Sequence, residues 1–455
     1  MKKDMLFVKE QSSTYIYEKG LEISKEIAIR LSDPKFVFDS VHTLDNVMTE
    51  TDHFPWGDIS LSHGYPGNIH LLSLWRRIDE SINWNHAIHS NMVEVQSCLA
   101  RYGTGDISLY SGWAGIASAV YAASNQGEFY NQFLNQIHRW MSPMVEQWLQ
   151  ASTEILRQKN GVPMELYDTI SGASGVGRYL LKNATDPLIA PLIEPILRFL
   201  VDLTEPICIN DKMVPGWFTP SKFHSTAGDK SNFPVGSFNC GMAHGIPGPL
   251  ALLSAAYNSG IEVPGQYRAI EYITEWLLDS QEEDELGSYW PHIIPFEELM
   301  TKNKLLRQRE AWCYGTPGVA CALYISSISL NNTTVAQTAL QSFIKAVSYE
   351  CDRNRMDSPS LCHGLSGLLL MSWRMWNFTK DPAIKPLIDQ LMTRLLQRFD
   401  SSTPLGYKDA EPGAANTMRW LTKAGLLEGA AGIAATLVSV GEAEHNDWDY
   451  MLMLS

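Results

Sequence analysis

The chain has 455 residues, 45% hydrophobic and 19% charged, a balance that supplies a large core and excludes extensive disorder. Its formal net charge of −15 excludes a basic phosphate-binding surface, so nucleic acid is not an expected partner. We expect neither a signal peptide, because no sustained apolar run follows Met1, nor a membrane span, because the longest apolar tract contains Glu428. Seven scattered cysteines favour reduced thiols in a cytoplasmic protein.

The first predicted helix covers residues 21–31, where Leu21, Ile23, Ile27 and Leu31 form one apolar face. A short glycine motif, x-G-x-x-G, then recurs seven times, with successive copies 48, 60, 73, 70, 49 and 65 residues apart. The copies begin at His63, Ser111, Ser171, His244, Tyr314, His363 and Glu428. Because they are spread over nearly the whole chain, they indicate a repeat architecture.

Two kinds of helix alternate along this repeat. The segments after Gly367 and Gly432 are apolar on every side, as in helices buried all round. Between the motifs lie helices with one apolar face, such as the one after Asp381-Pro382, a predicted N-cap and first turn. The alternation predicts an all-α protein, an α/α toroid of seven inner and seven outer helices, with residues 1–455 as a single domain.

Three connections are too long for simple turns: residues 205–239, 282–311 and 400–426. They are rich in Pro, Gly, Trp and Ser, and loops of this length are uncommon unless they are functional. Residues 289–294 resemble a strand. We therefore expect long loops or a small β-containing extension over the barrel mouth, inserted near 205–239 and 282–311.

A metal site is predicted at the start of two consecutive inner helices. Cys313 stands just before the fifth glycine motif, and Cys362 and His363 stand at the sixth. Consecutive inner helices are neighbours in a toroid, so we expect these side chains to meet at one rim. Two thiolates and an imidazole suit Zn²⁺, and three protein ligands leave one position open, as in catalytic sites. The alternative is that both cysteines are buried apolar side chains.

Further polar residues stand near the same predicted rim. Asp168 precedes the third motif, His244 opens the fourth, and Arg309 lies four residues before Cys313. A carboxylate, an imidazole and a guanidinium beside a metal could form an acid/base set. Alternatively, Asp168 caps its helix and Arg309 is a solvated charge. His63 occupies the equivalent place in the first motif without a neighbouring thiol, and we interpret it as structural.

Three sequence segments, in this order, resemble the lanthionine synthetase C-like family, the cyclases of lanthipeptide biosynthesis. They are Gly-Met-Ala-His-Gly at 241–245, Trp-Cys-Tyr-Gly at 312–315 and Cys-His-Gly at 362–364, and the sevenfold glycine motif supports them. The resemblance implies an α/α toroid with one zinc ion per chain. The zinc ligands fall on Cys313, Cys362 and His363, and the catalytic set on Asp168, His244, Arg309 and Tyr314.

The implied reaction is Michael-type addition of a peptide cysteine thiol to dehydroalanine or dehydrobutyrine, which closes a (methyl)lanthionine ring. Zinc would remove the proton from a thiol whose free pKa is about 8.5. His244 is the expected proton donor to the enolate, and Asp168 either deprotonates the thiol or orients His244. Arg309 either keeps Asp168 ionised or stabilises the enolate charge.

The resemblance also implies partners and a location. The substrate would be a dehydrated precursor peptide of leader and core, and the partners would be a cognate dehydratase and an export transporter. The protein would be cytoplasmic, held at the inner face of the cell membrane through these partners. One alternative is a zinc-dependent protein prenyltransferase-like subunit, although such enzymes need a basic diphosphate pocket. Another is a non-enzymatic family member that binds glutathione or proteins.

Overall fold

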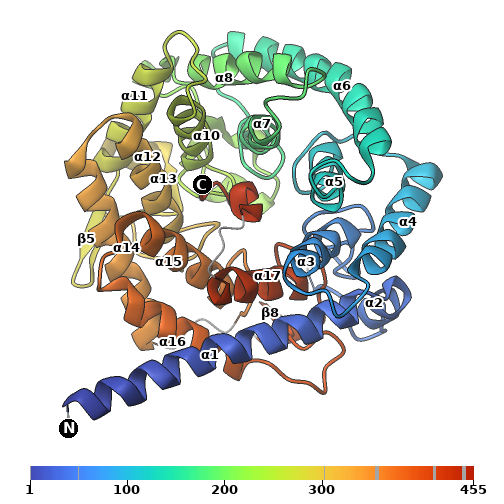
Figure 1. The fold of residues 1–455 in the computed structure, drawn as a ribbon. Helices are drawn as coiled ribbons and strands as arrows, with labels where there is room; N and C mark the ends of the chain where they lie inside the picture. Colours follow the sequence, from blue (N-terminus) through green and yellow to red (C-terminus); the bar gives the residue numbers. More distant parts are fainter. Residues whose placement is uncertain (1, 50, 302, 354–357, 413–416, 443–446) are drawn as a thin grey trace. The chain divides into compact units, whose positions relative to one another are not determined.

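Each of the seven glycine motifs marks the start of a helix (Figure 1). The computed structural model describes residues 2–49, 51–301, 303–353, 358–412, 417–442 and 447–455. Within these ranges the motif helices are α3 (Tyr65–Ile78), α5 (Trp113–Ala123), α7 (Ala173–Lys182), α10 (Pro247–Asn258), α13 (Thr316–Ser329), α15 (Leu365–Thr379) and α17 (Ala430–Gly441). In α17 every residue from Ala430 to Val440 is buried, as predicted for an inner helix.

The motif requires glycine because the preceding loop passes directly over the first helical turn. A Cβ atom on Gly432 would lie 1.7 Å from the carbonyl oxygen of Leu426, and one on Gly67 would lie 2.6 Å from the carbonyl oxygen of Leu61. Gly315 has a further reason, since its φ of +104° is strained for any residue with a side chain. The motif is therefore a packing device that brings a loop close to each inner helix.

The helices between the motifs bury one face each. They are α1 (Lys2–Leu31), α4 (Trp84–Tyr102), α6 (Asn131–Arg157), α8 (Ile193–Asp202), α11 (Gln266–Asp279), α14 (Thr333–Arg353) and α16 (Ile384–Gln397). The predicted N-cap of α16 is wrong: the helix begins at Ile384 with Ala383 as its cap. The Asp381 carboxylate instead accepts a hydrogen bond from the Ala383 nitrogen and so closes a separate turn before the helix.

Contacts divide the chain into two units. Unit 1 comprises Met1–Asp106, Tyr110–Leu134 and Glu350–Trp448, and unit 2 comprises Ile107–Leu109, Asn135–Tyr349 and Asp449–Ser455. In unit 1 the inner helices contact one another in the order α15, α17, α3 and α5, while α16, α1 and α4 cover α15, α17 and α3 (Figure 1). In unit 2, α10 contacts both α7 and α13, and α8 and α11 cover α7 and α10. Each unit therefore has an inner and an outer layer of helices.

Short strands occur in all three long connections. Unit 2 contains two hairpins and one three-stranded sheet. The hairpins are β1 (Ile207–Ile209) with β2 (Lys212–Val214) and β5 (Glu282–Asp284) with β6 (Gly287–Tyr289), and the sheet consists of β3 (Thr219–Pro220), β4 (Gly236–Asn239) and β7 (Ile293–Pro295). Unit 1 has the hairpin of β8 (Asp409–Pro412) and β9 (Met418–Leu421). Of the predicted strand 289–294, only the two ends are strands, and residue 302 of the second insertion lies outside the described residues.

Three short helices complete the described chain: α2 (Pro34–Val41), α9 (Ala227–Asn232) and α12 (Phe296–Thr301). Among the described residues, no helix combines the length and the apolar character that crossing a membrane requires. The strands nevertheless matter for the site, because β4 leads directly into the segment that carries His244, and β8 carries Asp409.

His70 makes the stability of unit 1 dependent on pH. It lies buried on α3, where its Nε2 is 3.0 Å from the Ser118 hydroxyl of α5, and burial, together with the charge of Arg77, lowers its pKa to about 3. An unfolded histidine has a pKa of about 6.5. Between the two pKa values the histidine is therefore protonated in the unfolded chain and neutral in the folded chain. Stability is therefore complete above the unfolded pKa and falls as the pH drops below it, by about 2 kcal/mol at pH 5.

The variant His70→Gln keeps a polar group for Ser118 but does not titrate. Denaturant unfolding at pH 7 and pH 5 should show that the wild-type protein loses about 2 kcal/mol more than the variant over this interval. Equal losses in the two proteins would contradict a buried neutral His70.

Candidate active site and metal-binding residues

Asp168 and His244 form a direct pair in unit 2. Asp168 is fully buried just before α7, and its Oδ2 lies 2.6 Å from Nδ1 of His244. Its other oxygen, Oδ1, accepts hydrogen bonds from the backbone nitrogens of Ser171 at 2.7 Å and Gly172 at 2.8 Å. Asp168 is therefore not the N-cap of α7, whose cap residue is Gly172; its Oδ1 fixes the turn before the helix and its Oδ2 remains for His244.

His244 is held so that one ring nitrogen stays available. Its segment is folded back by hydrogen bonds from the Gly245 nitrogen to the Gly241 carbonyl and from the Ile246 nitrogen to the Asn239 carbonyl. Since Nδ1 donates to Asp168, the other nitrogen, Nε2, is the one that can exchange protons with a substrate. The side chain is 34% exposed, which gives a substrate access to it.

The surroundings raise the pKa of His244. Burial lowers it, but the hydrogen bond from the ring to Asp168 and the negative charge of Asp168 outweigh burial, with smaller contributions from Cys313 and Glu165. The protonated imidazole is therefore retained to a higher pH than in a free histidine. A raised pKa favours the protonated imidazole, which is the form that can give a proton to an enolate.

Tyr314 lies beside this pair. Its hydroxyl accepts a hydrogen bond from Nδ2 of Asn239 at 3.0 Å, and its ring centroid is 6.2 Å from that of His244 and 5.0 Å from that of His292. The sequence interpretation missed Asn239 and His292. Asn239 ends strand β4 shortly before the motif that carries His244, and this position at a strand end was the available signal.

Arg309 and Arg307 differ sharply in their surroundings. The Arg309 side chain is exposed, while its backbone carbonyl accepts a hydrogen bond from Nε2 of His292 at 2.8 Å. Arg307 instead pairs with Asp284 at 2.9 Å and with Glu310 at 2.6 Å. Glu310 is buried and accepts hydrogen bonds from the nitrogen and the hydroxyl of Thr316, so it caps α13. This network, which the sequence interpretation missed, anchors the loop that carries Cys313.

The proposed metal ligands have well-defined backbones. Cys313 is 5% exposed, and its carbonyl oxygen accepts a hydrogen bond from the Ala243 nitrogen, next to His244. In unit 1 the Cys362 nitrogen donates to the Leu427 carbonyl at 2.8 Å. Cys313 belongs to unit 2, whereas Cys362 and His363 belong to unit 1. Two thiols and one imidazole are a soft to borderline donor set, which fits Zn²⁺ better than Mg²⁺ or Ca²⁺.

A buried charge cluster surrounds His363 in unit 1. Its Nε2 lies 3.6 Å from Oδ2 of Asp409, and its Nδ1 lies 3.9 Å from Oε1 of Glu428. Lys423, whose side chain is 1% exposed, contacts Asp409 at 3.0 Å, Glu428 at 2.9 Å and also Glu411. Burial lowers the pKa of Lys423, but the three carboxylates outweigh it and raise that pKa, so this lysine stays charged.

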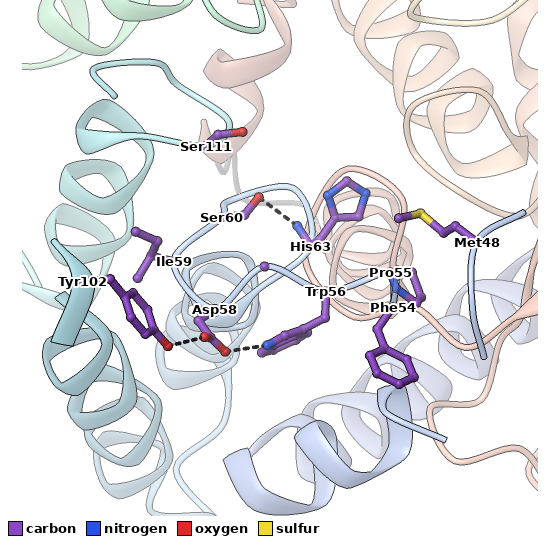
Figure 2. Close-up of a pocket in the computed structure, with 11 residues that line it drawn as sticks. Met48, Phe54, Pro55, Trp56, Asp58, Ile59, Ser60, His63, Tyr102 and Ser111 are labelled. Atoms are coloured by element: carbon purple, nitrogen blue, oxygen red, sulfur yellow. Dashed lines mark hydrogen bonds between the residues drawn. The ribbon is translucent and has the colours of Figure 1, made fainter. Parts of the chain in front are cut away.

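A cavity of about 390 Å³ in unit 1 has His63 on its wall. Figure 2 shows its other lining, in which the Asp58 carboxylate accepts hydrogen bonds from Nε1 of Trp56 at 2.6 Å and from the Tyr102 hydroxyl at 2.8 Å. His63 Nε2 lies 3.1 Å from Oε2 of Glu428, and Glu428 in turn faces His363. A chain of polar contacts therefore connects this cavity with the ring of His363.

Comparisons with known proteins identify the family of the chain. Residues 55–453 match the family model described as lanthionine synthetase C-like protein. The chain is 28% identical over 369 residues to the nisin biosynthesis protein NisC of Lactococcus lactis subsp. lactis, covering 80% of this chain and 85% of that protein. The solved structure of nisin cyclase matches with a TM-score of 0.72 and 24% identity, over 88% of this chain and 93% of that one.

The structural likeness confirms the predicted fold class, an all-α protein with the α/α toroid fold. The family match extends over most of the chain and includes every residue named above for the metal and for acid/base chemistry. The chain therefore belongs to the lanthionine synthetase C-like family.

Proposed function

We propose that this protein is a lanthipeptide cyclase, an enzyme that adds peptide cysteine thiols to dehydroalanine or dehydrobutyrine and so forms (methyl)lanthionine rings. The observation that carries the proposal is the Asp168–His244 pair, with a distance of 2.6 Å, in a member of the lanthionine synthetase C-like family. A partly exposed imidazole whose pKa is raised by a buried carboxylate is suited to transferring a proton to carbon. The relative NisC, named as a nisin biosynthesis protein, supports the same reaction class.

Cys313, Cys362 and His363 would hold one zinc ion, which would lower the pKa of a substrate thiol so that it reacts as the thiolate. The sulfur–carbon bond forms at the β-carbon of the dehydro residue, and the π electrons move toward the adjacent carbonyl to give an enolate. The thiol proton is released to solvent, and the proton on Nε2 of His244 passes to the α-carbon. The neutral imidazole then takes up a proton from solvent, so no proton is gained or lost overall. Asp168 keeps the proton on Nδ1 and stabilises the imidazolium between turnovers.

Tyr314 and Arg309 would complete the catalytic set. The Tyr314 hydroxyl, held by Asn239, would help orient the substrate beside His244. Arg309, exposed in the loop before Cys313, is available to stabilise the enolate oxygen when substrate is bound. Neither role requires a change in the Asp168–His244 pair.

We infer the wider context from family membership. The substrate would be a dehydrated precursor peptide with leader and core, and a dehydratase and an export transporter would be partners at the inner face of the cell membrane. The location would be cytoplasmic. We also propose that both units belong to one domain, because a single family model extends over residues 55–453.

The test uses a synthetic peptide that contains one dehydroalanine and one cysteine. After incubation with the protein and then with iodoacetamide, mass spectrometry should show loss of the alkylatable thiol with no change in peptide mass, because cyclisation is an isomerisation. Peptides that stay fully alkylatable with zinc-loaded protein would contradict the proposal and favour a non-enzymatic, thiol-binding member of the family.

Metal analysis tests the ligand set independently of turnover. Purified protein should contain one zinc ion per chain, and Cys362→Ser should lose it, since a hydroxyl is a far weaker zinc ligand than a thiolate. Cys208→Ser makes the same chemical change at an exposed thiol on β1 and should keep the zinc. Equal zinc content in the two variants would exclude Cys362 as a ligand.

A further inference from the structure

Both ring nitrogens of His363 face buried or partly buried carboxylates, and the nearer one belongs to Asp409. The distance from Nε2 to Oδ2 of Asp409 is 3.6 Å, against 3.9 Å from Nδ1 to Oε1 of Glu428. Asp409 is 2% exposed at the start of β8. Its Oδ1 accepts a hydrogen bond from the Ser358 hydroxyl, and its Oδ2 accepts one from Lys423 at 3.0 Å. The carboxylate is therefore fixed in place before any metal is considered.

Glu428 is less suited to hold the ring. Its side chain is 22% exposed, whereas that of Asp409 is 2% exposed, and its Oε1 lies farther from the ring than Oδ2 of Asp409 does. The two carboxylates also belong to different segments, since Glu428 opens the last glycine motif while Asp409 is the first residue of strand β8.

The charges around His363 do not balance within the cluster. One ammonium group, that of Lys423, faces the three carboxylates of Asp409, Glu411 and Glu428. The formal excess is two negative charges, and all four groups are buried or largely buried. Uncompensated negative charge at low dielectric favours a cation close by. It would therefore attract a divalent metal ion bound to His363.

We propose that Asp409 is a positioning residue of the metal centre. Oδ2 of Asp409 lies 3.6 Å from Nε2 of His363, close enough to draw the ring proton to that nitrogen. Nδ1 would then be unprotonated and serve as the ligand atom, while Lys423 and Ser358 hold Asp409 in position. A carboxylate on the second nitrogen of a ligating histidine fixes the tautomer and ring orientation and makes the imidazole a stronger donor. This inference rests on the proposed function only in taking His363 as a zinc ligand.

The variant Asp409→Asn tests the assignment without measuring turnover. Competition with a chelator of known zinc affinity should show binding 10- to 100-fold weaker than in the wild-type protein, as is typical when such an outer partner is lost. The visible d–d absorption of the Co²⁺-substituted protein should also change, because the imidazole orientation and donor strength change. An unchanged zinc affinity together with an unchanged Co²⁺ spectrum would overturn the proposal.

Two comparisons separate positioning from a general loss of stability. Asp186→Asn removes the carboxylate from another buried histidine, His138, at 2.8 Å, and should leave the zinc affinity unchanged. Ser358→Ala keeps the Asp409 charge but removes one group that holds it, so zinc binding should weaken severalfold, and this variant serves if Asp409→Asn does not fold. A stronger loss of zinc in Glu428→Gln than in Asp409→Asn would overturn the assignment in favour of Glu428.

The outcome is distinguishable from failure of the proposed function. Wild-type protein that binds zinc but cyclises no peptide would refute the cyclase proposal and leave the Asp409 prediction standing. Wild-type protein that binds no zinc would remove the basis of the Asp409 assignment, whereas the Asp168–His244 pair would still be open to test.

Discussion

The substitution Asp168→Asn is expected to lower the rate of ring closure by about 10²- to 10⁴-fold, the usual contribution of a positioned acid or base. The asparagine carbonyl can still accept from the Ser171 and Gly172 nitrogens, so the turn before α7 is retained. The amide group then faces Nδ1 of His244 and donates to it. This reverses the tautomer and removes the charge that raises the pKa of His244.

The pH dependence gives a second readout of the same change. In the wild-type protein the raised pKa keeps His244 protonated to higher pH, so activity that depends on the imidazolium should persist there. In Asp168→Asn the high-pH limb of the rate profile should move to lower pH. The rates are measured by thiol alkylation and mass spectrometry over a pH series.

The matched control is Asp186→Asn, which alters the His138–Asp186 pair in the same unit. His138 is fully buried on α6 and cannot meet a substrate. This variant should keep its rate and its pH profile. A similar loss of rate in both variants would show that the effect of Asp168→Asn comes from unit 2 stability and not from proton transfer.

The substitution Lys423→Met is expected to destabilise unit 1 by about 3–5 kcal/mol, the cost of removing one partner from a buried ion pair. It leaves three carboxylates, those of Asp409, Glu411 and Glu428, without the ammonium group that they surround. The loss should appear in denaturant unfolding at pH 7. The loss of unfolding free energy should not depend on bound zinc. The unfolding is therefore measured in the presence of a chelator.

Lowering the pH should reduce the difference between Lys423→Met and the wild-type protein. Burial raises the pKa of Asp409 and Glu428, but neighbouring histidines and Lys423 outweigh it, so both values lie below the ordinary range. Their stabilising contribution is therefore present above the unfolded pKa, near ~4, and is lost as the pH falls further. In the variant these carboxylates accept protons more readily, which relieves their repulsion.

Lys385→Met is the control for this experiment. Lys385 is 38% exposed and pairs with Asp389 one helical turn away on α16, so its loss should cost less than about 1 kcal/mol. If both lysine variants were equally stable, the cluster around Lys423 would not be a structural element of unit 1.

The sequence by itself determined the helical repeat and the residue types of the site. The x-G-x-x-G motif could be recognised because it has a local cause. A loop passes so close to the helix start that a Cβ atom would clash with it, as at Gly432. Cys313, Cys362 and His363 could be selected because they occupy equivalent positions in two consecutive repeats. Asp168 and His244 followed from the same argument, since His244 opens the fourth motif and Asp168 stands three residues before the third.

Only the tertiary structure decided which charges are buried and which residues face one another. An isolated lysine or aspartate is normally solvated, so nothing in the sequence around Lys423 or Asp409 indicates burial. Asp409 and Lys423 lie in the long connection between α16 and α17, and they contact residues at the starts of α15 and α17. No periodic pattern extends through such a connection, so the sequence does not predict these contacts. The same reason explains why Glu310 and Asn239 were missed. Local patterns therefore predicted where the chemistry lies, whereas burial and pairing across distant segments set its charge state.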